Sequence, residues 1–195
     1  MDRKVKMAPN LDVKEYVWSI LEKLASLFDG VTNSIKIVEY EHHEIHAGSH
    51  YFYRDKNEIA SGSTQDYIVY APHSSKHIHF VYTVDGSAIT QFDLYEETDR
   101  LGTTLQNTFN SDRNSSNTPG MKVYKGQSGG TTDGTLLKTY KGGAAAQQSR
   151  QGSMIRATEE IVLKENTKYL IRITSGTNNN LTNVLFTWYE HTSNV

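Results

Sequence analysis

The chain of 195 residues has no cysteine and no long apolar run. Without cysteine it can form neither a disulfide nor a thiolate-based zinc site or nucleophile. No apolar stretch reaches the roughly 20 residues that a membrane-spanning helix needs. Residues 1–7 are charged and lack the apolar core of a secretory signal. We therefore expect no membrane partner, and the missing thiols suit assembly in a reducing cytoplasm.

An excess of basic charge is also missing. The chain carries 20 lysine and arginine residues against 22 aspartate and glutamate residues, for a formal net charge of −2. Proteins that bind nucleic acid usually present a basic face, so we expect no nucleic-acid partner. Only 36% of the residues are hydrophobic, yet apolar and polar residues alternate through much of the chain, which excludes full disorder. This composition, with its 12 tyrosines, favours a β-rich domain.

An apolar stripe of helical period runs through residues 11–28. Its members recur at the spacings of one helix face and are Val13, Val17, Ile20, Leu21, Leu24, Leu27 and Phe28, with Trp18 near the edge. Asn10 or Asp12 can cap the start of this helix, and Asp29-Gly30 can end it. A stripe this wide must be covered, either by the protein's own domain or by a partner.

After this helix the pattern changes to the period of two that indicates strands. The predicted strands cover residues 34–46, 50–54, 66–70, 77–84, 89–96, 167–175 and 181–190, with a further one within 153–162. Asp85-Gly86 is a strong hairpin signal and predicts that the strands on either side of it pair. The turn at 176–180 predicts a second hairpin from the last two strands. Alternation places inward Ile78, Phe80, Tyr82, Val84, Phe92, Leu94, Tyr169, Ile171, Ile173, Val184, Phe186 and Trp188.

The segment 101–154 differs in composition, because 27 of its 54 residues are Gly, Ser, Thr or Asn. We expect long loops there, joining short strands at 121–124 and 135–140. Many short strands without a βαβ alternation predict an all-β fold, a β-sandwich of jelly-roll type with one N-terminal amphipathic α-helix. The predicted domains are an arm and helix at 1–33 and the sandwich at 34–195.

A histidine-rich string, EYEHHEIHAGSH, offers a first metal-site candidate. If residues 40–46 form a strand, His42, Glu44 and His46 share one face, and two histidines with one carboxylate form the ligand set of a facial metal triad. On an extended strand these ligands spread over about 13 Å, too far to meet at one ion without a bend. The spacing therefore favours a polar strand face.

A second candidate is the pair His77 and His79. A jelly roll with this H-x-H pattern suggests the cupin metal site, which would also need a nearby carboxylate and a later histidine. No carboxylate follows at the expected distance, and His191 is the only late histidine. The pattern favours two outward-facing histidines. With no nucleophile elbow or P-loop in the sequence, we predict no catalytic residue and no cofactor.

Sugar binding is a further alternative, because aromatic residues and Asn-rich loops are typical of carbohydrate sites. Tyr124, Tyr140 and the run 178–180 offer these groups. The same composition also occurs in ordinary solvent-exposed loops. Binding to a host glycan therefore stays an open alternative at this point.

Four segments in order along the chain resemble a known family. They are IVEYEHHEIHAGSHYFY (37–53), FDLYEET (92–98), SDRNSSNT (111–118) and LKENTKYLIRITSGTNNNLTNVLFTWYEH (163–191). This order is similar to that in a family of tailed-bacteriophage virion proteins, described as head decoration, cement or head-fibre proteins. The resemblance covers about residues 35–191 and carries no catalytic residues to this chain.

The resemblance implies a non-enzymatic structural protein on the capsid exterior of the virion, assembled in the host bacterial cytoplasm. Its partners would be the major capsid protein and further copies of itself, with a homotrimer favoured. We expect the capsid or subunit contacts to use Arg3, Lys4, Lys6, Val17, Trp18, Leu21 and Leu24. Two other interpretations remain: a head fibre that binds host glycans, and a cupin-like metal-dependent enzyme that uses His77, His79 and His191.

Overall fold

The computed structural model describes residues 13–25, 40–144, 153–156 and 160–192. The chain divides into two units, Met1–Glu39 and Tyr40–Val195. In the first unit the described residues form helix α1 (Val13–Ala25). In the second they form a short helix and twelve strands. Within the described ranges, neither helix has the length and apolar character needed to cross a bilayer.

Helix α1 lies within the predicted helical segment 11–28. Its apolar side chains are exposed: Val17 by 48%, Trp18 by 57%, Ile20 by 40%, Leu21 by 48% and Leu24 by 49%. Four of these five recur at the spacings of one face, as the sequence pattern indicates. The predicted helix ends at residues 11–12 and 26–28 lie outside the described residues.

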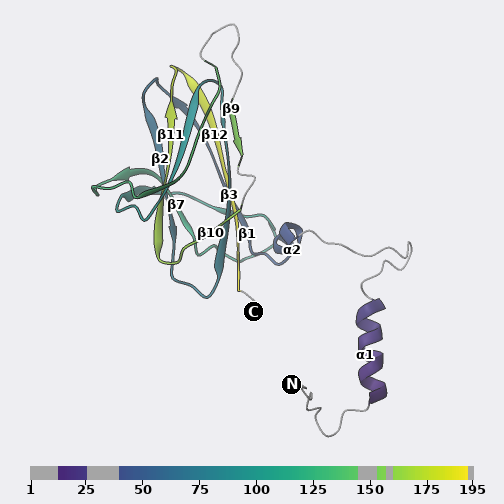
Figure 1. The fold of residues 1–195 in the computed structure, drawn as a ribbon. Helices are drawn as coiled ribbons and strands as arrows, with labels where there is room; N and C mark the ends of the chain where they lie inside the picture. The colour runs from purple at the N-terminus through teal and green to yellow at the C-terminus, as the bar shows by residue number, and fades with distance from the viewer. Residues whose placement is uncertain (1–12, 26–39, 145–152, 157–159, 193–195) are drawn as a thin grey trace, which may run out of the picture. The chain divides into compact units, whose positions relative to one another are not determined.

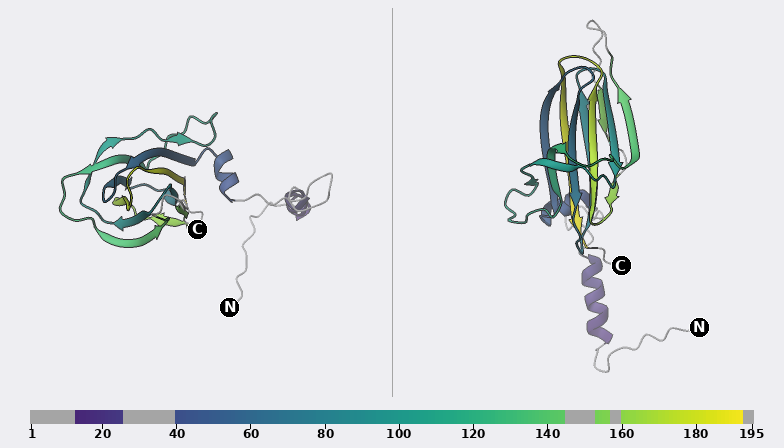
Figure 2. Two further views of the ribbon diagram at one scale, coloured as in Figure 1. Left: turned by 90° about the horizontal axis from the view of Figure 1, so that it is seen from above. Right: turned by 90° about the vertical axis from the view of Figure 1, so that its left-hand side faces the viewer.

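The described part of the second unit is an all-β sandwich of two six-stranded antiparallel sheets. The first sheet contains β1 (His50–Ile59), β3 (His77–Gly86), β6 (Phe109–Asn110), β9 (Ser153–Arg156), β10 (Ile161–Leu163) and β12 (Asn180–His191). The second contains β2 (Thr64–Ala71), β4 (Thr90–Glu96), β5 (Leu101–Leu105), β7 (Lys122–Ser128), β8 (Thr135–Gly142) and β11 (Thr167–Ser175). Their strand orders are β10-β3-β12-β1-β6, with β9 also on β3, and β5-β7-β2-β11-β4-β8. The two sheets pack face to face (Figures 1 and 2).

The core between the sheets is rich in aromatic residues. Alternate residues of both sheets point inward, and the predicted inward set from β3, β4, β11 and β12 is buried as expected. Tyr51, Tyr53, Tyr67, Tyr82 and Tyr169 are buried among them. A buried tyrosine hydroxyl needs a partner, and that of Tyr67 donates to Asp55 Oδ2 at 2.7 Å while accepting from Asn57 Nδ2 at 2.7 Å. The abundance of tyrosine therefore serves the core as well as the surface.

Both predicted hairpins are wrong, although the strands that they join are present. β3 and β4 lie in different sheets, and so do β11 and β12. The chain crosses the sandwich at each link, so that Tyr82 of β3 and Phe92 of β4 stack across the core with ring centroids 4.3 Å apart. Two strands whose inward faces are both apolar bury more surface when they face each other than when they lie side by side.

The predicted strand at 40–46 is also wrong, because these residues form helix α2 (Tyr40–His46); residues 34–39 lie outside the described residues. Gly48 ends the helix in the left-handed conformation, with φ of +67°, where glycine is favoured. A side chain at Gly48 would also collide with Ser115. Glu44 is buried, and the hydroxyl of Ser49 donates to its carboxylate. These contacts favour the helix over the strand that the alternating polarity of residues 40–46 predicts.

The segment 101–154, where we expected long loops, contains strands β5 to β8 and the start of β9. The short strand expected at 121–124 overlaps the start of β7, and the one expected at 135–140 lies within β8. The connection between β7 and β8 is fixed by ion pairs on the outer face of the second sheet. Arg172 pairs with Asp66 at 3.0 Å and with Asp133 at 2.6 Å, and Arg100 pairs with Asp133 at 3.0 Å. The polar composition of segment 101–154 therefore reflects strands at exposed sheet edges and a turn held by ion pairs, rather than long loops.

Candidate functional site

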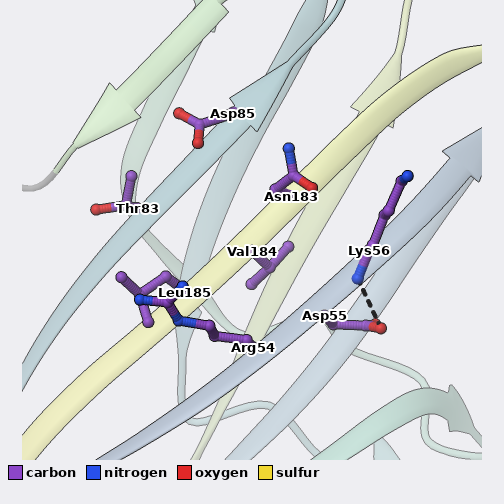
Figure 3. A pocket seen from close by; sticks show the side chains of 8 residues that line it. All are labelled: Arg54, Asp55, Lys56, Thr83, Asp85, Asn183, Val184 and Leu185. Atoms are coloured by element: carbon purple, nitrogen blue, oxygen red, sulfur yellow. Dashed lines mark hydrogen bonds between the residues drawn. The ribbon is translucent and has the colours of Figure 1, made fainter.

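The outer face of the first sheet is hollowed by three connected depressions of about 610, 390 and 300 Å³. Leu185 on β12 lines all three, so they form one trough along β1, β12 and β3. Figure 3 shows the largest, where Arg54, Asp55 and Lys56 of β1 lie on one side of β12, and Thr83 and Asp85 of β3 lie on the other. The trough carries charges of both signs and does not select an anion or a cation by net charge.

The second depression holds the densest group of titratable side chains. Glu41 of α2, His50 of β1, His79 of β3 and Glu160 line it together with Tyr189 of β12. Tyr189 lies directly opposite His79 in the strand register, and the two rings stack with centroids 4.5 Å apart. The hydroxyl of Tyr189 donates to Glu160 Oε2 at 2.6 Å, and Glu160 Oε1 pairs with Nδ1 of His79.

The structure brings together two of the histidines in the cupin-like interpretation. His79 Nε2 lies 2.9 Å from His191 Nε2, because β3 and β12 are neighbours and His191 lies opposite His77 in the register. All three histidines are therefore on one face of the sheet. Sequence reasoning missed Glu160, which reaches His79 only because β10 pairs with β3. Among the described residues, no three His, Cys, Asp or Glu side chains are placed to hold one metal ion.

The proposed triad of His42, Glu44 and His46 does not form. On helix α2, residues four apart share a face, so His42 and His46 meet with their Nε2 atoms 3.0 Å apart. Glu44 lies on another side of the helix and is buried against Ser49. The expectation that all three share a face was wrong because it assumed a strand.

His50 links α2, β1 and the segment after β6. It is buried, its Nδ1 lies 2.6 Å from the hydroxyl oxygen of Ser111, and its Nε2 lies 3.5 Å from the carboxylate of Glu41. Burial lowers the pKa of His50 below its ordinary value, and the nearby carboxylates of Glu41 and Glu44 only partly oppose this.

Glu190 is the centre of a polar cluster at the same end of the sandwich. Its carboxylate is buried and accepts hydrogen bonds from the backbone nitrogens of Gly120 at 2.9 Å and Met121 at 3.0 Å, and from Trp188 Nε1 at 3.1 Å. Its own backbone nitrogen donates to Ser49 O at 3.0 Å. Glu190 therefore ties the end of β12 to the segment just before β7 and to the turn between α2 and β1.

The residues considered for sugar binding do not form one site. Tyr124 is on β7 and Tyr140 is on β8, and three strands of the sheet lie between them. Asn180 is fully buried, while Asn178 uses its side-chain oxygen to accept from Ser61 N. These residues lie too far apart to form a single glycan pocket together.

The proposed contact residues divide between described and undescribed parts of the chain. Arg3, Lys4 and Lys6 lie outside the described residues. The others, Val17, Trp18, Leu21 and Leu24, are exposed on α1. An exposed apolar helix face is available for contact with another molecule.

A comparison of the chain with protein-family models finds no match, and a comparison with curated proteins finds no similar sequence.

Proposed function

We propose that the protein is a non-enzymatic structural protein of a bacteriophage virion. It binds the outer surface of the capsid, decorates the head and stabilises it. Its partners are the major capsid protein and two further copies of the same chain. The sequence segments that resemble phage head decoration, cement and head-fibre proteins support this assignment, and the protein would reach the capsid exterior after assembly in the bacterial cytoplasm.

The exposed apolar stripe of α1 carries the proposal. A helix of 13 residues is about 20 Å long and is marginally stable by itself in water. Its described apolar side chains are 40–57% exposed, so the helix gains most from a surface that covers Val17, Ile20, Leu21 and Leu24. Three copies of the same helix provide such a cover for one another. In this arrangement α1 is the element that joins the subunits.

The sandwich is, in this proposal, of the jelly-roll type. The support is the strand order: β10-β3-β12-β1 in one sheet and β2-β11-β4-β8 in the other. Successive strands β1 to β4 alternate between the two sheets, as do β11 and β12. Jelly rolls with this alternation occur in viral capsid and lectin domains. A rigid domain of this kind suits a role that depends on surface contact.

Binding across neighbouring capsomers explains how such a protein would stabilise a shell. A stable interface buries roughly 1,200–2,000 Å², and a trimer that contacts the shell at three points gains further from avidity. Expansion or rupture of the shell would have to break all of these contacts together.

Shells prepared with and without the protein test the stabilising role. We expect shells that lack it to rupture at lower temperature and under milder osmotic shock, and we expect added purified protein to restore both properties. Unchanged resistance in its absence would contradict stabilisation.

A further inference from the structure

We propose that the largest depression on the outer face of the first sheet binds an acidic saccharide. Its volume of about 610 Å³ lies within the range of about 300–1,000 Å³ that is typical of small-molecule sites. The carboxylate of the ligand contacts Arg54 and Lys56, and its hydroxyl groups contact Asp85. The site uses no residue of α1, so it is independent of the subunit and capsid contacts proposed above.

The strand register arranges six of the lining side chains in two rows across β1, β12 and β3, because directly paired residues share one face of a sheet. The first row is Lys56, Asn183 and Asp85, and the second is Arg54, Leu185 and Thr83. Neighbouring strands are about 4.8 Å apart, so each row is about 10 Å wide. The two cationic groups therefore lie at the β1 end of the rows and the carboxylate lies at the β3 end (Figure 3).

Asp85 carries the strongest sign of a missing partner. Its Oδ1 atom is buried and accepts no hydrogen bond from any part of the chain that the structure describes. Burial of a carboxylate oxygen without a hydrogen bond is unfavourable. A ligand that donates to Asp85 removes this cost, and sugar hydroxyl groups are donors of this kind.

Arg54 and Lys56 provide the positive charge that an anionic group needs. Both side chains are exposed. Asp55 lies between them in sequence but is already paired, with Lys125 Nζ at 2.7 Å and with the Tyr67 hydroxyl at 2.7 Å. A guanidinium can bind a carboxylate through two parallel hydrogen bonds, so Arg54 also fixes the orientation of the ligand.

The positions of the charges, rather than their sum, select the ligand. A simple anion would leave Asp85 unpaired, and a simple cation would be repelled by Arg54 and Lys56. A saccharide with a carboxylate on its ring carries an anion and several hydroxyl donors within the width of one row. Asn183 and Thr83 can donate to and accept from further hydroxyl groups.

Calorimetric titration of the full chain with trigalacturonate at neutral pH and low salt tests the proposal. We expect saturable binding that weakens about tenfold or more in Arg54→Ala and in Lys56→Ala, because each variant loses a charge-assisted hydrogen bond. The matched control is Lys122→Ala, an exposed lysine on β7 of the other sheet, which should leave the affinity unchanged. Circular dichroism and thermal unfolding confirm that each variant is folded.

Asp85→Asn separates specific contacts from general attraction of anions. The variant makes the depression more positive, yet it should bind trigalacturonate more weakly because the hydroxyl groups lose a charged acceptor. Tighter binding by this variant would show that the depression only attracts anions and would overturn the proposal.

Two probes test the class of ligand. Maltotriose has hydroxyl groups without a carboxylate, and triaspartate has carboxylates without sugar hydroxyl groups, so each should bind about tenfold more weakly or worse. Absence of saturable binding by trigalacturonate, equal binding of either probe, or an equal loss in Lys122→Ala would overturn the proposal.

Nuclear magnetic resonance of the wild-type chain with trigalacturonate needs no variant. Shifted amide signals at Arg54, Lys56 and Asp85 support the site, whereas shifts confined to other parts of the chain contradict it.

Discussion

Asn180 donates a hydrogen bond from Nδ2 to the backbone oxygen of Ile89 at 3.0 Å, across 91 residues of sequence. The same amide donates to Thr90 Oγ1 at 2.9 Å and accepts from Ala88 N at 3.0 Å and from Ser87 Oγ at 3.2 Å. One fully buried side chain thus joins the start of β12 to the link between β3 and β4. The contact lies where the β3–β4 crossing and the β11–β12 crossing meet.

Asn180→Ala is expected to lower the free energy of unfolding by about 3 kcal/mol. The substitution removes the hydrogen bonds of the Asn180 amide to Ala88 N, Ile89 O and Thr90 Oγ1. Ile89 O still accepts from Gly176 N at 2.9 Å, so the cost comes mainly from the buried bonds at Ala88 and Thr90, and the loss of a buried bond costs about 1–3 kcal/mol. Urea unfolding followed by fluorescence measures the change. Asn183→Ala, on the exposed side of β12, is the matched control and should change stability by less than about 0.5 kcal/mol. Equal effects of the two variants would show that Asn180 does not hold the crossings.

Glu190→Ala is expected to destabilise the protein by about 2–4 kcal/mol, because two backbone amides and the Trp188 indole lose their acceptor. Glu190→Gln keeps one accepting oxygen and should fall between the wild type and the alanine variant. Thermal unfolding ranks the stabilities of the wild type, Glu190→Gln and Glu190→Ala. Glu58→Ala, an exposed position on β1, controls for the loss of a glutamate, and a comparable loss there would argue against the buried carboxylate cluster.

Stability is expected to fall as the pH drops below about 6.5, and His50 is expected to contribute to this. Burial lowers the pKa of His50 from its ordinary value of 6.5, so below that pH the unfolded chain binds more protons than the folded protein. The contribution of His50 is therefore fully present above pH 6.5 and decreases below it, by at most about 1.4 kcal/mol per pH unit for one proton.

Unfolding free energies of the wild type and of His50→Gln, measured between about pH 7 and pH 5, isolate this contribution. Glutamine can still bond to the hydroxyl of Ser111 but does not titrate. The variant should show the shallower decline. A decline as steep as that of the wild type would mean that other groups, and not His50, cause the pH dependence.

Replacement of Leu21 and Leu24 by glutamate should separate the subunits. The two carboxylates place charge in the apolar stripe of α1, and burial of unpaired charge is strongly unfavourable. Light scattering coupled to size exclusion should show the mass of three chains for the wild type and of one chain for the double variant. Glu22→Gln, on the opposite side of the helix, should remain trimeric. A monomeric wild type would contradict the subunit role of α1.

The sequence predicts the strands and their inward faces well, because alternation is a local property of Ile78, Phe80 and their counterparts in the other strands. It does not predict which strands pair. Asp85-Gly86 is a local hairpin signal, and it was overridden by contacts such as those of Asn180 that join distant segments. A jelly-roll order is itself incompatible with pairing of β3 and β4, so the two predictions conflicted from the start.

The candidate site was only partly predictable for the same reason. His79 and His191 are visible as candidates in the sequence, but Glu160 is not, since its approach to His79 depends on the pairing of β10 with β3. The segment around His42 was wrongly predicted as a strand because its residues alternate in polarity. The only local sign of a helix is Gly48, which ends it. The backbone oxygen of Gly48 accepts from Asn110 Nδ2 at 2.8 Å and from Asn117 Nδ2 at 3.1 Å, and both residues lie far along the chain.

The central claim is that this chain lies on the outside of a phage head. Cryo-electron microscopy of purified particles that contain the protein tests it most directly. We expect density for three copies of the two-sheet sandwich on the outer surface of the shell, at contacts between capsomers. Density for this chain inside the shell or at the tail would contradict it.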